Sequence, residues 1–246
     1  MGRSGVTAAV RARRGYTDAE DALRFLESDG VLHDPFLFPQ MQAARERLLK
    51  AVTQGEKICI HGDYDVDGIT STALLVYVLR DLGADVTAHL PNRFTEVYGI
   101  AMPTVERIAA DGAGLLVTVD CGIGARAQIA RAAEIGMDSI VIDHHRPVEA
   151  DLPAAITISP LLCDYPFKEL AGVGLAFKVA QALLENPDKD SSSSDLQPEL
   201  ARLLDLVALG TIADVVPLID ENRALVRRGL VRLARTSSTC SRGSCR

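Results

Sequence analysis

From residue 56 onward, short apolar runs alternate with segments of helical periodicity. The runs are KICIHG, DVTAHL, GLLVTVD and DSIVID, and the helical segments are expected near residues 70–82, 104–110, 125–135, 173–184, 198–209 and 221–234. Alternation of this kind is typical of βαβ units, in which helices cross over a parallel sheet. The sequence therefore predicts an α/β fold with a mostly parallel sheet flanked by helices.

The regions on either side of this pattern have a different character. We expect a helical lead-in over residues 1–55, the α/β domain over 56–235 and an aberrant, disordered tail over 236–246. In the lead-in, Thr17 and Glu20 have the spacing of a capping box. The Ser-rich stretch at 187–195 is read as a flexible excursion inside the domain. The tail, TSSTCSRGSCR, has lost all periodicity.

The composition is that of an ordinary globular protein, with 48% hydrophobic and 24% charged residues. No run approaches the roughly 20 apolar residues of a membrane helix, and the basic start lacks the apolar centre of a secretory signal. We therefore expect a cytoplasmic protein without a membrane partner. The five cysteines are scattered without a CxxC pair, which indicates neither a disulfide framework nor a zinc knuckle.

Acidic residues and histidines gather where three of the predicted strands end. They are His61, Asp63, Asp65 and Asp67 in HGDYDVDG, Asp120 in VTVDCG, and Asp143, His144 and His145 in VIDHHRP. Ligands of open α/β sheets bind beyond the carboxyl ends of the strands, so the three loops are expected to form one site. Carboxylates mixed with imidazoles favour Mn²⁺ or Mg²⁺. Two such ions promote phosphoryl transfer, and Asp120, alone on the middle loop, is the natural bridging ligand.

Single residues of this set could also have a purely structural role. An Asp after a strand often caps a helix instead of binding a ligand. DYDVDG also matches the start of an EF-hand loop, but Leu74 stands where that loop needs a bidentate Glu. His89 is read as a core residue and His33 as a surface residue. The formal net charge of −7 opposes binding to nucleic acid unless bound cations offset the acidic residues.

Six motifs occur in the order found in a known protein family. They are HGDYDVDGITSTALL, LPNRFTEVYGI, LLVTVDCGIGA, IVIDHHRP, DYPFKELAGVGLAFKVAQAL and LGTIADVVPLIDENRALVRRGL. In these motifs the chain resembles the DHH phosphoesterases, and the resemblance covers roughly residues 17–235. The DYDVDG, LAGVG and TIADVVPL segments are more similar to the single-stranded-DNA-specific exonucleases of that family than to its pyrophosphatases or small-oligonucleotide hydrolases.

The resemblance implies that residues 56–235 are a DHH catalytic domain for metal-dependent phosphodiester hydrolysis. The implied activity is a 5′-to-3′ exonuclease on single-stranded DNA, in repair and recombination, with a single-strand-binding protein and a helicase as possible partners. One alternative is a DHH hydrolase of short oligonucleotides or cyclic dinucleotides. A second is a noncatalytic DHH-fold binding module or an inactive fragment, although the retained acidic residues favour catalysis.

The resemblance also implies roles for individual residues. The implied ligands of two Mn²⁺ or Mg²⁺ ions are His61, Asp65, Asp67, Asp120, His144 and Asp214, with Asp63 as a ligand or close by. The implied catalytic residues are Asp63, Asp120 and His145, of which His145 would face the scissile phosphate. Asp143 would orient a histidine. Arg93, Gly172 and Gly174 would contact the substrate, the two glycines through backbone N–H groups at the start of a helix.

The chain departs from the family pattern at three places. Val97 stands where Gly is usual, and Ser159 stands where Asn is usual. Both departures concern the expected substrate loops and leave the expected metal ligands unchanged. The exonucleases of the family also carry a second domain, and nothing in this sequence corresponds to it. The similarity to the family stops near Arg235, so we expect a truncated or frameshifted chain.

Overall fold

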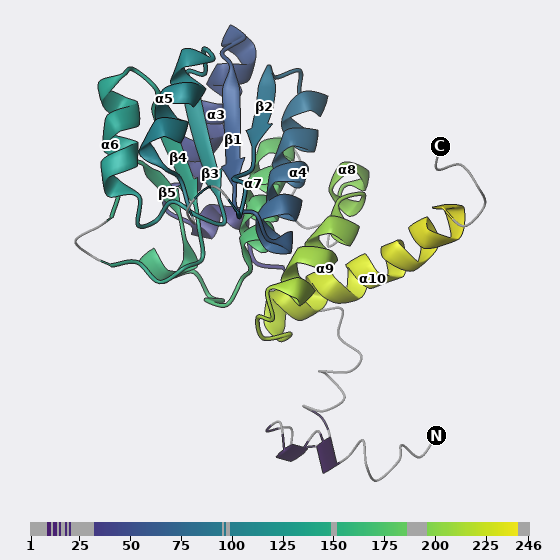
Figure 1. Ribbon diagram of the computed structural model, residues 1–246. Coiled ribbons are helices and arrows are strands. Elements are labelled where there is room, and N and C mark those ends of the chain that lie inside the picture. Colours follow the sequence, from purple (N-terminus) through teal and green to yellow (C-terminus); the bar gives the residue numbers. More distant parts are fainter. Residues whose placement is uncertain are drawn as a thin grey trace.

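The computed structural model describes residues 32–240, with gaps at 95, 97–98, 149–151 and 186–195, and isolated positions among residues 9–20. Its centre is a five-stranded sheet in the order β2-β1-β3-β4-β5 (Figure 1). The strands are β1 Ile58–Gly62, β2 Val86–His89, β3 Leu115–Val119, β4 Asp138–Ile142 and β5 Ile156–Ile158. Every neighbouring pair is parallel, which confirms the predicted α/β fold.

Helices cover both faces of the sheet. They are η1 Pro35–Leu37, α3 Met41–Gln54, α4 Val66–Asp81, α5 Met102–Ala110, α6 Arg126–Glu134, η3 Pro160–Leu162, α7 Gly172–Leu184, α8 Pro198–Ala201, α9 Leu204–Ala213 and α10 Asp220–Cys240. Successive strand residues point to opposite faces. Ile60 and Val117 pack with α3, α4 and α7, whereas Leu116 and Val141 pack with α5 and α6 (Figure 1). Both faces are buried, as is usual for a parallel sheet.

The register of the three central strands places their following loops side by side. Gly62 at the end of β1 pairs with Val119 of β3, and Val119 pairs in turn with Ile142 of β4. The residues that follow these three positions therefore leave the sheet at the same edge. This confirms the expectation that the acidic loops meet at the carboxyl ends of the strands.

Several elements differ from the sequence-based expectation. Helix α4 begins at Val66, four residues before the expected start, because the Asp65 carboxylate accepts the N–H of Gly68 and caps it. The single helix expected over 198–209 is divided into α8 and α9. The strand β5 was not expected from its three residues.

The expected domain boundaries stay predictions. Thr17 and the Ser-rich stretch at 187–195 lie outside the described residues. Helix α10 continues to Cys240, past the expected boundary at 235, and residues 241–246 are also outside the described part. Among the described residues, no helix combines the length and the apolarity needed to cross a membrane.

Candidate metal centre

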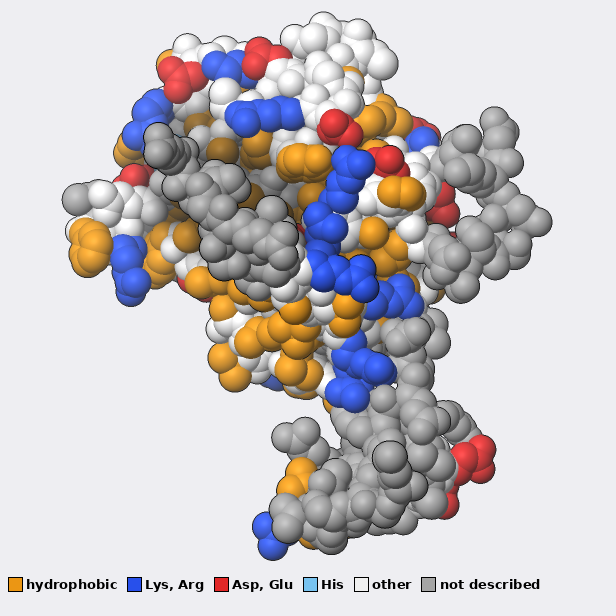
Figure 2. All heavy atoms as spheres, turned by 90° about the vertical axis from the view of Figure 1, so that its right-hand side faces the viewer, with side chains coloured by type: hydrophobic (Ala, Val, Ile, Leu, Met, Phe, Trp, Pro, Cys, Tyr) orange, Lys and Arg blue, Asp and Glu red, His pale blue; other side chains and the backbone are white. Residues whose placement is uncertain are grey.

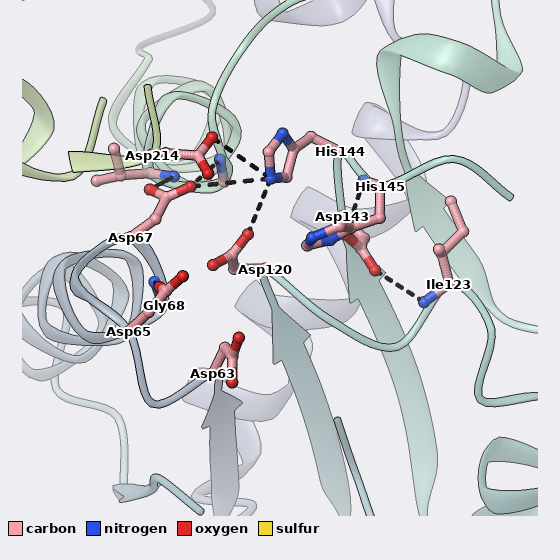
Figure 3. A network of polar contacts seen from close by, with 12 residues as sticks. Asp63, Asp65, Asp67, Gly68, Asp120, Ile123, Asp143, His144, His145 and Asp214 are labelled. Atoms are coloured by element: carbon pink, nitrogen blue, oxygen red, sulfur yellow. Dashed lines mark hydrogen bonds and ion pairs between the residues drawn. The ribbon is translucent and has the colours of Figure 1, made fainter. Parts of the chain in front are cut away.

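Three carboxylates surround one ring nitrogen of His144. Its Nε2 atom lies 3.1 Å from Oδ1 of Asp120, 3.7 Å from Oδ2 of Asp214 and 4.0 Å from Oδ2 of Asp67 (Figure 3). One imidazole nitrogen carries at most one hydrogen, so it cannot serve three carboxylates as a donor. A cation between these groups would satisfy all of them.

The side chains form three overlapping groups in which one possible ligand atom from each residue lies within 4.8 Å of those of the other two. The groups are Asp67, His144 and Asp214; Asp120, His144 and His145; and Asp63, Asp65 and Asp120. Asp120 and His144 each belong to two groups. Asp120 therefore has the position that a ligand shared by two metal ions requires.

Asp67 is held in place by the first turn of α7. Its Oδ2 atom accepts the N–H of Gly172 at 2.6 Å, and its Oδ1 atom accepts the N–H of Val173 at 2.9 Å. The N-terminus of a helix favours an anion, so the carboxylate is fixed although its side chain is buried. Gly172 thus uses its N–H on a protein carboxylate, whereas the resemblance implied a substrate phosphate.

The two glycines of α7 are also positions of close packing. A Cβ atom at Gly172 would lie 2.7 Å from Oδ1 of Asp120, and one at Gly174 would lie 3.0 Å from Cδ2 of Leu170. A side chain at Gly172 would therefore displace the central carboxylate of the site. The substrate contacts implied for both glycines stay predictions.

The other two acidic residues of the first loop have local hydrogen bonds. Asp65 is exposed and caps α4 through Oδ1, as an Asp that follows a strand often does. Asp63 is buried and accepts the N–H of Tyr64 at 2.7 Å through Oδ1. Each carboxylate has a second oxygen that these local bonds do not use.

Several buried polar atoms of the site lack a hydrogen-bond partner among the described residues. They are His61 Nε2, Asp120 Oδ1, His144 Nε2 and Asp214 Oδ2. The contact between His144 and Asp120 is short, but it lacks the geometry of a hydrogen bond. Buried polar groups are normally satisfied, so a cluster of unsatisfied ones indicates a missing ion or water.

Burial and charge shift the pKa values of these groups. Desolvation raises the pKa of Asp67 and of Asp120, and the negative charge of Asp120 adds to the effect on Asp67. Burial lowers the pKa of His144, but the carboxylates of Asp120, Asp214 and Asp67 outweigh it and raise the value. The centre thus tends to retain protons when no metal ion neutralises its carboxylates.

Asp143 fixes the orientation of His145. Its Oδ1 atom accepts both the ring Nδ1–H at 2.8 Å and the backbone N–H of His145 at 3.0 Å. Its Oδ2 atom accepts the N–H of Ile123 at 2.9 Å (Figure 3). The hydrogen bond that His145 donates to Asp143 raises the pKa of His145 above its ordinary value, which favours the charged imidazolium.

Among the described residues, His61 is the one expected ligand that lies outside the three groups. It is fully buried, its ring stacks on that of His89 at 5.1 Å, and the two Nδ1 atoms are 3.0 Å apart. Burial lowers the pKa of His61 to about 4, so the ring is neutral and able to bind a metal ion. His89, read from the sequence as a core residue, is partly exposed and also contacts Arg107.

Arg93 lies over an aromatic ring beside the acidic loop. Its Cζ atom is 5.5 Å from the ring centroid of Tyr64 and 5.9 Å from that of Phe94, whose side chain is 88% exposed. Ser159 is buried and follows β5 as the N-cap residue of η3. Val97 lies outside the described residues.

Asp214 reaches the site from a different part of the fold. It follows α9, as the C-cap residue, and its backbone N–H donates to the carbonyl of Gly210. None of the five described strands leads into it, so the pattern of strands and acidic loops gave no sign of it. Only the TIADVVPL motif of the family resemblance indicated this residue.

Comparison with known proteins gives matches over most of the chain. The DHH family, N-terminal domain, matches residues 57–211. The single-stranded-DNA-specific exonuclease RecJ of Bacillus subtilis (strain 168) is 44% identical over 236 residues, which cover 94% of this chain and 28% of that protein. RecJ of Thermus thermophilus is 41% identical over 197 residues, 80% of this chain and 28% of that protein.

Solved structures agree with these matches. A crystal structure of exonuclease RecJ bound to manganese has a TM-score of 0.69 and 40% identity, and covers 78% of this chain and 47% of that one. The structure of RecJ of Thermus thermophilus in complex with Mn²⁺ has a TM-score of 0.71 and 35% identity. The match covers 90% of this chain and 30% of that one. The chain therefore spans only about 30% of the length of the first curated relatives. Because the family model covers more than half of its residues, including β1, β3, β4 and their acidic loops, the chain belongs to the DHH family.

Proposed function

We propose that this chain is the catalytic domain of a metal-dependent phosphodiesterase that acts on single-stranded DNA. The observation that carries the proposal is the group of three carboxylates around Nε2 of His144. The relatives that are 41–46% identical are single-stranded-DNA-specific exonucleases, and two related structures contain manganese. The geometry and the relatives therefore support the same chemistry.

The residues fit two divalent ions of the Mn²⁺ or Mg²⁺ type. One ion would be held by Asp67, Asp120, His144 and Asp214, and the other by Asp63, Asp65, Asp120 and the Nε2 atom of His61. Oxygen ligands with one or two imidazoles match the preference of these metals. Such ions act as Lewis acids on phosphoryl oxygens and promote the attack of water. The unsatisfied buried atoms of Asp120, His144 and Asp214 are those that a metal ion would engage.

His145 is the residue that we assign to the substrate phosphate. Asp143 holds its Nδ1–H, so the ring presents Nε2 on the side away from that carboxylate. The hydrogen bond and the charge of Asp143 raise the pKa of His145 and favour the imidazolium form. A fixed positive donor lowers the barrier most when negative charge grows on the phosphoryl oxygens in the transition state.

Substrate contacts outside the metal centre fit a single strand with exposed bases. Arg93 offers a guanidinium for a phosphate, and the exposed ring of Phe94 beside it offers a stacking surface for a base. The net charge is −7, but Lys and Arg side chains form a row on the face turned to the viewer in Figure 2. We propose that the strand is digested from its 5′ end, as the family resemblance implies.

The proposal extends to the cellular setting. A single-strand-binding protein would hold such a substrate, and a helicase would produce it, so both are proposed partners of the longer protein. Repair and recombination are the processes in which such strands arise. We propose the cytoplasm as the compartment, because the proposed substrate is DNA.

Product analysis tests this function. DNA of about 30 nucleotides, labelled at either the 5′ or the 3′ end, is incubated with the chain and Mn²⁺, beside a cyclic dinucleotide and a duplex. We expect mononucleotides from the labelled 5′ end of the single strand and no loss of the duplex. Cleavage of the dinucleotide with an intact single strand would favour the small-substrate hydrolases instead, and cleavage of neither would indicate a noncatalytic module.

A further inference from the structure

We propose that Asn222 is a positioning residue of the metal centre, although it lies outside the centre itself. It donates hydrogen bonds to two connecting segments. One segment carries Asp214, and the other leads to the N–H groups that donate to Asp67. The inference rests on the proposed function, because it concerns the same pair of metal ligands.

Asn222 is fully buried in the first turn of α10. Its side-chain nitrogen donates to the carbonyl of Pro217 at 3.1 Å and to the carbonyl of Glu169 at 2.5 Å. Pro217 lies in the segment 214–219, which joins α9 to α10 and begins with Asp214. The amide group of Asn222 therefore links the backbone at Pro217 to the backbone at Glu169, two positions far apart in the sequence.

The segment 214–219 has a strained backbone. Val215 has a φ of 62°, and Asp220, the next residue after the segment, has a φ of 44°. A β-branched residue in the left-handed region is a rare and costly conformation, which persists only where surrounding contacts impose it. The side chain of Val215 is 85% exposed, so its own packing cannot impose this backbone. The bond from Asn222 to Pro217, between the two strained residues, can impose it.

The second bond of Asn222 acts on the other metal ligand. Glu169 lies three residues before Gly172, whose N–H holds the carboxylate of Asp67 together with that of Val173. Asp67 and Asp214 approach the same atom, Nε2 of His144, at 4.0 and 3.7 Å. The distance between these two carboxylates therefore depends on the segments that Asn222 connects.

The neighbouring Glu221 holds α10 in place, and its partner Tyr165 provides a matched control. Its carboxylate pairs with the buried Lys178 of α7 and accepts the hydroxyl of Tyr165 at 2.6 Å and the N–H of His33 at 2.8 Å. The hydroxyl of Tyr165 thus belongs to a buried polar network that holds α10 without touching Asn222. Its loss should lower stability without a direct effect on segment 214–219.

Calorimetric titration with Mn²⁺, combined with thermal unfolding of the metal-free chain, tests the role of Asn222. We expect wild type to bind two ions. Asn222→Ala should weaken one of the two by about tenfold or more, as for other residues that orient metal ligands, and leave the other unchanged. Tyr165→Phe should lower the melting temperature by a similar amount while both affinities stay at the wild-type value.

A second substitution separates positioning from general stability. Val215→Gly adopts the left-handed backbone without strain, so in the Asn222→Ala background it should recover part of the lost affinity. If Asn222→Ala does not fold, Asn222→Ser, which retains one donor, is measured with the same expectation.

Three results decide between the proposals. Absence of Mn²⁺ binding by wild type would overturn the metal centre and the proposed function, and with them the role of Asn222. Two ions in wild type, with both affinities unchanged in the Asn222 variant, would overturn only the positioning role. Equal weakening in the Asn222 and Tyr165 variants would show that loss of stability alone explains the effect, and would also overturn it.

Discussion

Nε2 of His144 lies 3.1 Å from Oδ1 of Asp120, and the two residues follow the adjacent parallel strands β4 and β3. Each of the two belongs to two of the three groups of possible ligands. The sheet register thus places at its carboxyl edge the two side chains that both halves of the site share. A change at either residue should therefore affect the whole centre.

The two adjacent histidines should differ in their tasks. His144→Ala should weaken Mn²⁺ binding by about 100-fold or more, since loss of even an outer partner of a metal ligand costs about 10–100-fold. His145→Ala should lower kcat by about 10²–10³-fold, the usual effect of removing a charge-stabilising donor, and keep the Mn²⁺ affinity. Calorimetry and single-turnover kinetics measure both. Equal loss of affinity in the two variants would make both residues ligands.

Metal affinity should increase with pH. Burial raises the pKa of Asp120 to about 6 and that of Asp67 to about 8 in the metal-free chain. Below these values the carboxylates hold protons, and the surrounding carboxylates also raise the pKa of His144 to about 9. A metal ion must displace these protons, so binding competes with protonation and tightens as the pH rises from about 6 to about 9. Calorimetry in two buffers of different ionisation enthalpy counts the released protons. A pH-independent affinity with no proton release would contradict the raised pKa values.

A glycine beside the site should be sensitive to the addition of a single methyl group. In Gly172→Ala the new Cβ would lie 2.7 Å from Oδ1 of Asp120, so the carboxylate must move and the Mn²⁺ affinity should fall by about tenfold or more. Gly124→Ala is the matched control, because its Cβ would meet no atom within 4 Å. Affinity and activity are measured for both variants. Equal values would show that the first turn of α7 does not determine the position of Asp120.

The sequence predicted the part of the site that lies on the sheet. Asp63, Asp120 and His144 each follow a buried parallel strand, and the rule that such strands share one edge is enough to bring them together. The apolar runs also predicted four of the five strands. The fifth, Ile156–Ile158, has only three residues, which is too short for a periodicity to be recognised.

The remaining residues depend on tertiary contacts that no local pattern encodes. Asp214 lies at the end of α9, and the N–H group of Gly172 that donates to Asp67 lies at the start of α7. Neither position follows from the order of the strands. Asp67 shows a different limit, since the sequence placed it in a loop, whereas it lies in the first turn of α4, which Asp65 caps. The aspartates of DYDVDG include both the residue that caps α4 and possible metal ligands. Their spacing alone does not show which aspartate has which role.

The buried ion pair between α7 and α10 should contribute strongly to stability. Lys178 and Glu221 are both fully buried and paired. Lys178→Met removes the cation and leaves a buried carboxylate without an opposite charge, which costs about 3–5 kcal/mol in similar cases. Urea unfolding of the metal-free chain measures this change in the free energy of unfolding. Arg131→Met, which loses only exposed ion pairs, should leave that free energy nearly unchanged, and a comparable loss in both variants would contradict the prediction.

The replacement Asp120→Asn tests the shared carboxylate. Asp120 has a φ of 59°, a left-handed conformation that Asn also tolerates, so the substitution removes the charge and keeps the backbone. Because the carboxylate is buried and its pKa is raised by desolvation, the metal-free variant should unfold at the wild-type temperature or above it.

The rate of Mn²⁺-dependent hydrolysis of 5′-labelled single-stranded DNA, compared between wild type and Asp120→Asn, tests the central claim most directly. Wild type should release nucleotides in Mn²⁺ and should stop doing so in excess EDTA. At every Mn²⁺ concentration, Asp120→Asn should stay folded and hydrolyse DNA no faster than wild type does in EDTA. Undiminished turnover by Asp120→Asn, or full wild-type activity in EDTA, would contradict a two-metal centre built around Asp120.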